Sequence, residues 1–126
     1  MMTDLMLARH QIVVESAQKV HARLGKRRPL QDYEAALVEE LRMHGIGIRE
    51  NKNTQILFGG TSVGVYLADI IIDGEILIEL KRAERLTDAE KSSFAGFVND
   101  FEYQRGYLMN FAADDLEVAS FPPSPR

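Results

Sequence analysis

Three ionisable side chains interrupt two apolar segments that otherwise have the composition of buried strands. Asp69 lies within residues 67–73, and Glu79 and Lys81 end the segment 75–81. An isolated charge in a strand core is costly unless it is paired or binds a metal ion. Two carboxylates beside a lysine are the groups that a hard divalent cation and a phosphate-cleaving site use. The alternative is a buried ion pair of Lys81 with one carboxylate, which would perform no chemistry.

The turn at Asp73-Gly74-Glu75 decides whether the two carboxylates face each other, because side chains alternate faces along a strand. A two-residue turn would put Asp69 and Glu79 on opposite faces. A three-residue loop, with its glycine in the left-handed conformation, pairs Ile72 with Ile76 and places Asp69 opposite Glu79. Both loop lengths are common in hairpins. We expect the three-residue loop.

This loop sorts the apolar residues of both strands by face. Alternation predicts that Glu79 and Lys81 share a face with Leu77. It also predicts that Asp69 shares a face with other odd-numbered residues, namely Val65, Leu67 and Ile71. The opposite face is then entirely apolar, and consists of Ile70, Ile72, Ile76 and Ile78.

Composition limits the class of protein. The chain has 126 residues, 45% hydrophobic and 27% charged, which is ordinary for a globular protein. It has no cysteine, so disulfides and thiolate metal sites are excluded. The net charge of −4 argues against non-specific nucleic-acid binding by the whole surface. No segment has the length of a membrane span and no signal peptide is visible, so we expect a cytoplasmic protein without membrane contact.

Periodicity predicts helices first, then strands, then a helix between strands. We expect one domain over residues 1–121 and a disordered, proline-rich tail over 122–126. Thr87-Asp88-Ala89-Glu90 has the pattern of a capping box, which predicts the start of the third helix. The expected helices are 3–24, 30–43 and 87–103, and the expected strands are 46–50, 53–58, 63–72, 76–81, 107–111 and 116–121, with a turn at 59–62.

Several segments, in order along nearly the whole chain, carry a resemblance to a known family. Asp69, nine residues, and Glu79-Leu80-Lys81 form the metal-binding signature of the PD-(D/E)XK nuclease superfamily. The wider pattern resembles one branch of it, the small GxxExxY proteins. The matching segments are 20–25, 33–37, Glu40-Leu41, Gly45, 64–69, 78–81 and 106–111.

The resemblance implies a fold and a site. The fold is α/β (α+β), with a central mixed β-sheet flanked by helices: a restriction-endonuclease-like αβββαβ core with an extra N-terminal helix. Asp69 and Glu79 would hold Mg²⁺ or Mn²⁺ at about 2.0–2.1 Å, with the backbone carbonyl of Leu80 completing the protein ligands. Lys81 would orient the attacking water or stabilise charge in the transition state.

The chain departs from the family pattern at five positions. Arg27 and Leu30 replace the glycine and glutamate that give the family its name. Glu90 and Ser93 replace a histidine and a glutamine early in the third helix, and Phe97 replaces a tyrosine one turn later. We expect Glu40, on the second helix, to substitute for the missing glutamate; the alternative is a boundary carboxylate that is paired with Arg42 or Lys81, or is solvated.

The resemblance favours a Mg²⁺-dependent nuclease that acts on phosphodiester bonds of DNA rather than RNA. Lost polar residues, acidic charge and small size favour a rival: a catalytically inactive relative that self-assembles or binds a partner. A nucleic-acid or nucleotide-binding protein without cleavage is a third hypothesis. The fold resemblance also leads us to expect a homo-oligomer.

Overall fold

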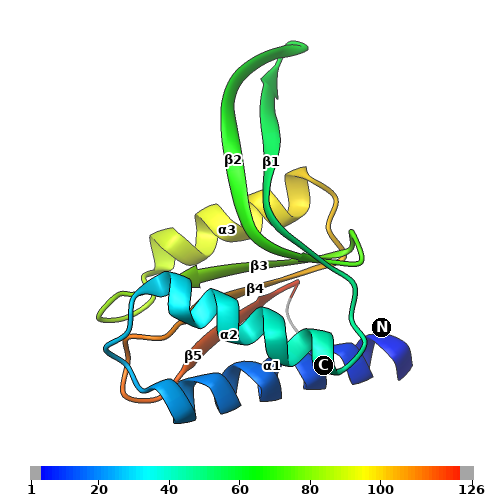
Figure 1. Ribbon diagram of the computed structural model, residues 1–126. Helices are drawn as coiled ribbons and strands as arrows, with labels where there is room; N and C mark the ends of the chain where they lie inside the picture. Colours follow the sequence, from blue (N-terminus) through cyan, green and yellow to red (C-terminus); the bar gives the residue numbers. More distant parts are fainter. Residues whose placement is uncertain (1–3, 123–126) are drawn as a thin grey trace.

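A computed structural model describes residues 4–122, which form three helices and one five-stranded sheet (Figure 1). Within these residues, no helix combines the length and apolar character needed to cross a membrane. Apart from Pro122, the tail expected at 122–126 lies outside the described residues. The elements are α1 (Asp4–Leu24), α2 (Leu30–Met43), β1 (Ile48–Phe58), β2 (Thr61–Ile72), β3 (Ile76–Lys81), α3 (Asp88–Asp100), β4 (Arg105–Asn110) and β5 (Glu117–Phe121).

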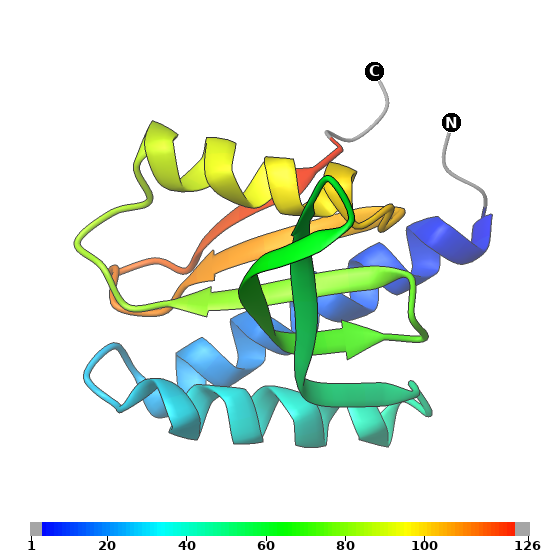
Figure 2. The same ribbon diagram turned by 90° about the horizontal axis from the view of Figure 1, so that it is seen from above.

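The sheet is mixed and lies between two layers of helices. Its strand order is β1-β2-β3-β4-β5; β3 and β4 are parallel, and the other neighbours are antiparallel. The helices α1 and α2 cover one face and α3 covers the other (Figures 1 and 2). The series α2-β1-β2-β3-α3-β4 is the expected αβββαβ restriction-endonuclease-like core, and α1 is the extra N-terminal helix. The predicted fold class is confirmed.

The loop between β2 and β3 has three residues, as expected. Ile72 pairs with Ile76, and Asp73 and Gly74 both have positive φ angles of 51° and 71°. The amide of Glu75 closes the loop on the carbonyl of Ile72 at 2.9 Å. Most residues adopt a positive φ angle only at a cost in energy. Glycine adopts it freely and aspartate more readily than most, and these are the two residues at the positive φ positions of the loop.

Each face of the sheet has its own core. The predicted apolar face, Ile70, Ile72, Ile76 and Ile78, is buried against α1 and α2. On the other face, Ile71 and Leu77 are buried with α3. The capping box of α3 is present, since the Thr87 hydroxyl accepts from the Glu90 amide at 3.1 Å and the Glu90 carboxylate accepts from the Thr87 amide at 3.2 Å.

The strands β1 and β2 form a long hairpin that projects from the sheet beyond α3 (Figure 1). Two separate strands were expected within 46–58, but β1 is continuous because its backbone pairs with β2 on both sides of residues 51–52. The expected four-residue turn is a two-residue turn at Gly59-Gly60. Both glycines have positive φ, the conformation that matches the twist of paired strands in a tight hairpin.

Strict alternation fails along β2. Asp69 was expected to share a face with Val65 and Leu67, but those side chains are exposed on the projecting hairpin. Tyr66 and Ala68 instead join Ile71 in the core under α3, although the pairing with β1 shows no shift here. The strand therefore twists strongly near Asp69, where it leaves the sheet. Asp69 itself lines a pocket with residues of α2, whereas Ile71 is buried under α3.

The close packing of α3 on β4 depends on Gly106. A Cβ atom there would lie 2.3 Å from the Val98 side chain and 2.8 Å from the Phe94 side chain, which are the buried residues of α3. We expect Gly106→Ala to lower the free energy of unfolding by about 1–3 kcal/mol, the usual cost of overpacking a core, in a urea titration.

Gly96→Ala is the matched control, because Gly96 lies in α3 with nothing within 4 Å of an added Cβ. Alanine in a helix interior is favoured over glycine by about 0.5–1 kcal/mol, so this variant should be slightly more stable. Equal urea midpoints for both variants would contradict the proposed packing.

Candidate metal and phosphodiester site

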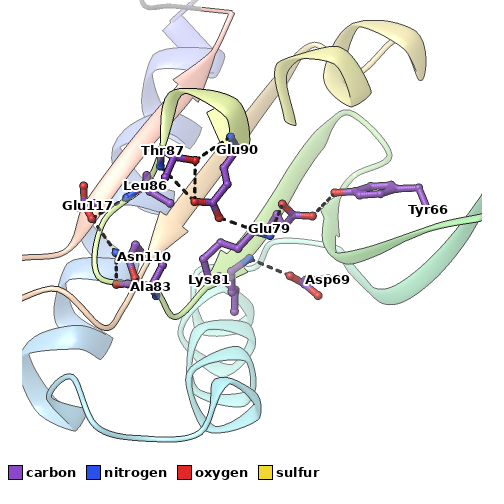
Figure 3. A network of polar contacts seen from close by, with 11 residues as sticks. Tyr66, Asp69, Glu79, Lys81, Ala83, Leu86, Thr87, Glu90, Asn110 and Glu117 are labelled. Carbon is purple, nitrogen blue, oxygen red and sulfur yellow. Dashed lines mark hydrogen bonds and ion pairs between the residues drawn. The ribbon is translucent and has the colours of Figure 1, made fainter. Parts of the chain in front are cut away.

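Asp69 is held against the backbone of β3. Its Oδ2 accepts a hydrogen bond from the Leu80 amide at 2.8 Å (Figure 3). The register of β2 and β3, with Ile70 opposite Ile78, puts Asp69 opposite Glu79 when extended by one pair. A residue in a strand directs its N–H and C=O to the same edge, so the Leu80 carbonyl also points toward β2.

Glu79 has partners on two sides. The Tyr66 hydroxyl donates to its Oε1 at 3.0 Å, and the Lys81 ammonium lies 3.8 Å from its Oε2. Lys81 also lies 3.9 Å from the carboxylate of Glu90, at the start of α3. Asp69, Glu79 and Lys81 therefore gather at one end of β3, with Glu90 above them (Figure 3). The structure therefore places the first three, which were expected to lie together, near one another.

Burial raises the pKa of both central carboxyl groups. For Asp69, the Leu80 hydrogen bond and the charge of Lys81 oppose this rise. For Glu79, the Tyr66 hydrogen bond and Lys81 oppose it, while the charge of Asp69 adds to it. Burial, together with the charge and hydrogen bond of Glu79, also raises the pKa of Tyr66, which keeps its hydroxyl protonated as a donor. The site thus contains negative charge that one lysine compensates incompletely.

Glu34 is a carboxylate of this region that sequence reasoning missed. It lines a pocket of about 220 Å³ between α2 and β3, together with Leu30, Gln31, Asp69 and Leu80. Burial, then the charge of Asp69 and that of Glu50, raises the pKa of Glu34. The signal in the sequence is its spacing: Glu34 follows Leu30, where the family's glutamate is missing, by one helical turn, so both face the same side.

Glu40 pairs with a residue outside this cluster. Its carboxylate forms an ion pair with Lys19 of α1 at 2.9 Å, which directs it toward the neighbouring helix. Six positions separate it from Glu34, and on a helix with about 3.6 residues per turn these positions face different directions. The hydrogen bond with Lys19 lowers the pKa of Glu40. Glu40 is therefore a paired carboxylate, but its partner is Lys19, whereas Arg42 pairs with Glu50 and Lys81 with Glu79 and Glu90.

Three residues of α3 that depart from the family pattern lie beside Glu79 and Lys81. Glu90, Ser93 and Phe97 line a pocket of about 280 Å³ with Glu79 and Lys81. Phe97 stacks on Tyr66, with ring centroids 4.1 Å apart. Phe94 is buried in the core, as expected for this aromatic stripe. The aromatic contact holds the Tyr66 hydroxyl beside Glu79.

The donor set suits a cation that keeps part of its water shell. Within residues 4–122, no group of three histidine, aspartate or glutamate side chains is placed to hold a metal ion. Mg²⁺ is usually bound by one or two carboxylates, with water and substrate phosphate supplying the other ligands. Asp69 and Glu79, with raised pKa values and mutual repulsion, are a pair of this kind, and the Leu80 carbonyl faces the same edge.

The chain combines an αβββαβ core with Asp69 on β2 and Glu79 and Lys81 at the end of β3. This combination is typical of nuclease-like proteins. A family model described as the PD-(D/E)XK nuclease superfamily matches residues 8–120. The chain belongs to this superfamily, whose nucleases generally use divalent metal ions. No curated protein and no solved structure matches the chain significantly.

The negative charge of Asp69 should affect the pKa values of the neighbouring carboxyl groups. We expect Asp69→Asn to lower the pKa of both Glu34 and Glu79, because burial remains while a nearby negative charge is lost. Carboxyl-detected NMR titration of wild type and variant measures this. Glu90 is the internal control, since hydrogen bonds from Thr87 dominate its lowered pKa. Unchanged titration of Glu34 and Glu79 would contradict the geometry.

The same variant has a predicted effect on stability. Because burial raises the folded-state pKa of Asp69 and Glu79 above the ordinary value of about 4, the folded state binds protons more tightly than the unfolded state. Their contribution to stability therefore falls as pH rises from about 4 through the raised pKa values. We expect metal-free Asp69→Asn to unfold at a higher urea concentration than wild type at neutral pH.

Asparagine retains an oxygen that accepts from the Leu80 amide, so this substitution changes mainly the charge. The buried ion-pair hypothesis gives the opposite result. Removing one partner of a buried pair costs about 3–5 kcal/mol, so a large loss of stability in Asp69→Asn at neutral pH would support that hypothesis.

Proposed function

We propose that this protein is a divalent-metal-dependent nuclease that hydrolyses phosphodiester bonds of DNA at the Asp69–Glu79–Lys81 site. The observation that carries the proposal is the placement of two half-buried carboxylates opposite each other at the end of β3, with a lysine beside them. Superfamily membership supports nucleic acid as the substrate class. DNA rather than RNA, the GxxExxY branch, a cytoplasmic location and a single domain belong to the same proposal.

Asp69, Glu79 and the Leu80 carbonyl would hold Mg²⁺ or Mn²⁺. A bound cation supplies Lewis-acid polarisation of the phosphodiester and lowers the pKa of a water molecule. Lys81 would donate to a phosphate oxygen or orient the attacking water, because its ammonium lies beside Glu79 without a close, fully formed ion pair. Tyr66 would keep Glu79 oriented through its hydroxyl hydrogen bond.

Glu34, rather than Glu40, is our candidate for the role of the missing helix glutamate. It opens onto the same pocket as Asp69, whereas Glu40 pairs with Lys19. Because its pKa is raised, the Glu34 carboxylate is a stronger proton acceptor than an ordinary glutamate, and it lines this pocket. In this role Glu34 would accept a proton from water or from a cation-ligating water at the α2 side of the site.

The rival function, an inactive relative that binds a partner or itself, has a specific observation in its favour. Glu79 is already engaged by Tyr66 and Lys81, and among residues 4–122 no third carboxylate is placed to hold a metal ion together with Asp69 and Glu79. A site satisfied by its own side chains has less need of a cation. The two functions differ in their response to metal.

Metal should stabilise the wild-type protein. A ligand that binds only the folded state raises the melting temperature with its concentration. We expect Mn²⁺ or Mg²⁺ to raise the melting temperature of wild type but not of Asp69→Asn, and wild type to nick plasmid DNA in the same buffer. Glu40→Gln is the matched control: it removes a carboxylate from α2 outside the site and should keep both responses.

The combinations of outcomes separate the hypotheses. A metal-dependent shift with nicking, both lost in Asp69→Asn, supports the nuclease. A shift without nicking indicates a metal-binding relative that does not cleave the DNA tested. The absence of a shift in wild type would overturn the metal site and leave the cluster structural. Loss of both responses in Glu40→Gln would contradict the exclusion of Glu40.

A further inference from the structure

The hairpin of β1 and β2 differs chemically from the rest of the chain. Residues 53–68, which we call the arm, contain no aspartate, glutamate, lysine, arginine or histidine, although 27% of the whole chain is charged. The arm projects beyond the helices, and Figure 2 looks down on it from the side toward which it points. A neutral projecting ribbon is unusual on an acidic protein that otherwise has a charged surface.

The two faces of the arm have different surroundings. On the inner face, Tyr66 is buried and Ile56 partly buried against the core under α3, and the Tyr66 ring stacks on Phe97. The outer face carries Val63, Val65 and Leu67, whose exposed fractions are 62%, 59% and 51%. Near the tip, Leu57 and Phe58 are 61% and 78% exposed. These large apolar side chains lie together on one projecting element.

The edges of the arm also lack strand partners within the described part of the chain. The strand β3 pairs with β2 only at Ile70–Ile72, so β2 from Thr61 to Asp69 pairs with β1 alone. The strand β1 is itself the edge of the sheet. A ribbon of only two strands is marginally stable, and exposed apolar edge strands tend to pair with another chain.

We propose that the outer face of the arm is the dimer interface of this protein, and that its partner is the same face of a second copy. In a two-fold symmetric dimer both subunits use the same surface patch, so one apolar surface on the chain is sufficient to form the interface. The whole chains, each with net charge −4, repel one another. The arm has no charged side chain, so two copies that meet through it would not place like charges together.

The size of the patch agrees with this partner. A standard interface covers roughly 800 Å² on each subunit. Val63, Val65 and Leu67 on the outer face are each at least half exposed, and Leu57 and Phe58 extend the apolar surface at the tip. The backbone of the unpaired strand edges can supply hydrogen bonds. Fully buried interface centres are depleted in charge, as the arm is.

Nucleic acid fits the arm less well. Affinity for DNA comes largely from lysine and arginine at phosphates, and residues 53–68 have neither. Apolar side chains do insert between base pairs in some proteins, and Phe58 at the tip has the required chemistry. That insertion is accompanied by cationic contacts along the groove, which the arm does not supply. DNA binding by the arm is therefore the alternative outcome of the test.

The experiment is sedimentation equilibrium of the full chain over a wide range of protein concentration. Wild type should form a dimer. The double variant Val65→Lys/Leu67→Lys should raise its dissociation constant by about a hundredfold or more, because four unpaired ammonium groups would enter one interface. Met43→Lys is the matched control, since Met43 is an apolar residue 71% exposed at the end of α2, and it should dimerise like wild type.

Val63→Lys is a second, milder variant nearer the tip, and thermal melting of each variant establishes that it is folded. A folded Val63→Lys that dissociates supports the interface even if the double variant does not fold. A wild-type monomer, or a dimer that survives Val63→Lys and the double variant, overturns the proposal. A wild-type monomer whose DNA binding is lost in the arm variants assigns the arm to DNA instead. None of these outcomes depends on nuclease activity.

Discussion

The short pairing of β2 with β3 determines how Asp69, Glu79 and Lys81 are placed at the candidate site. The two strands pair at Ile70–Ile78, Ile71–Leu77 and Ile72–Ile76, and the positive φ angles of Asp73 and Gly74 set this register. A slip of one residue would send every side chain of β3 to the other face. Just beyond the last pair, β2 turns away, which frees the Leu80 amide to donate to Asp69.

The site combines burial with an excess of negative charge. Burial dominates the raised pKa values of Asp69, Glu79 and Glu34, and Lys81 is the cation that acts against this rise at the first two. Such an arrangement disfavours the ionised apo site and favours a divalent cation that restores the balance. The electrostatics therefore support metal binding more directly than the number of ligands does.

Local rules predicted the order of the elements and the register of the two central carboxylates, and the family resemblance implied the fold. Alternation and turn chemistry gave the register of Asp69 and Glu79, and the capping box gave the start of α3. The role of α2 could not be obtained in this way. Whether Glu34 or Glu40 approaches Asp69 depends on how α2 is rotated on the sheet and on Lys19 from another helix, which are properties of tertiary packing.

The departure of β2 from the sheet was also beyond local rules. The segment 63–72 reads as one apolar strand, and alternation placed Val65 and Leu67 on the face of Asp69. The strand twists where β3 no longer pairs with it, so those side chains lie on the projecting arm. Twist of this kind depends on which neighbours a strand has along its length.

Tyr66 belongs to the arm and to the site at once. Its ring packs on Phe97, and its hydroxyl donates to Glu79. A displacement of the arm therefore changes the hydrogen bonding of a candidate metal ligand. By thermodynamic reciprocity, any free energy that association contributes to the ordering of Glu79 must return as tighter association when the site is loaded. The proposed subunit contact and the proposed cation site would therefore be coupled through Tyr66.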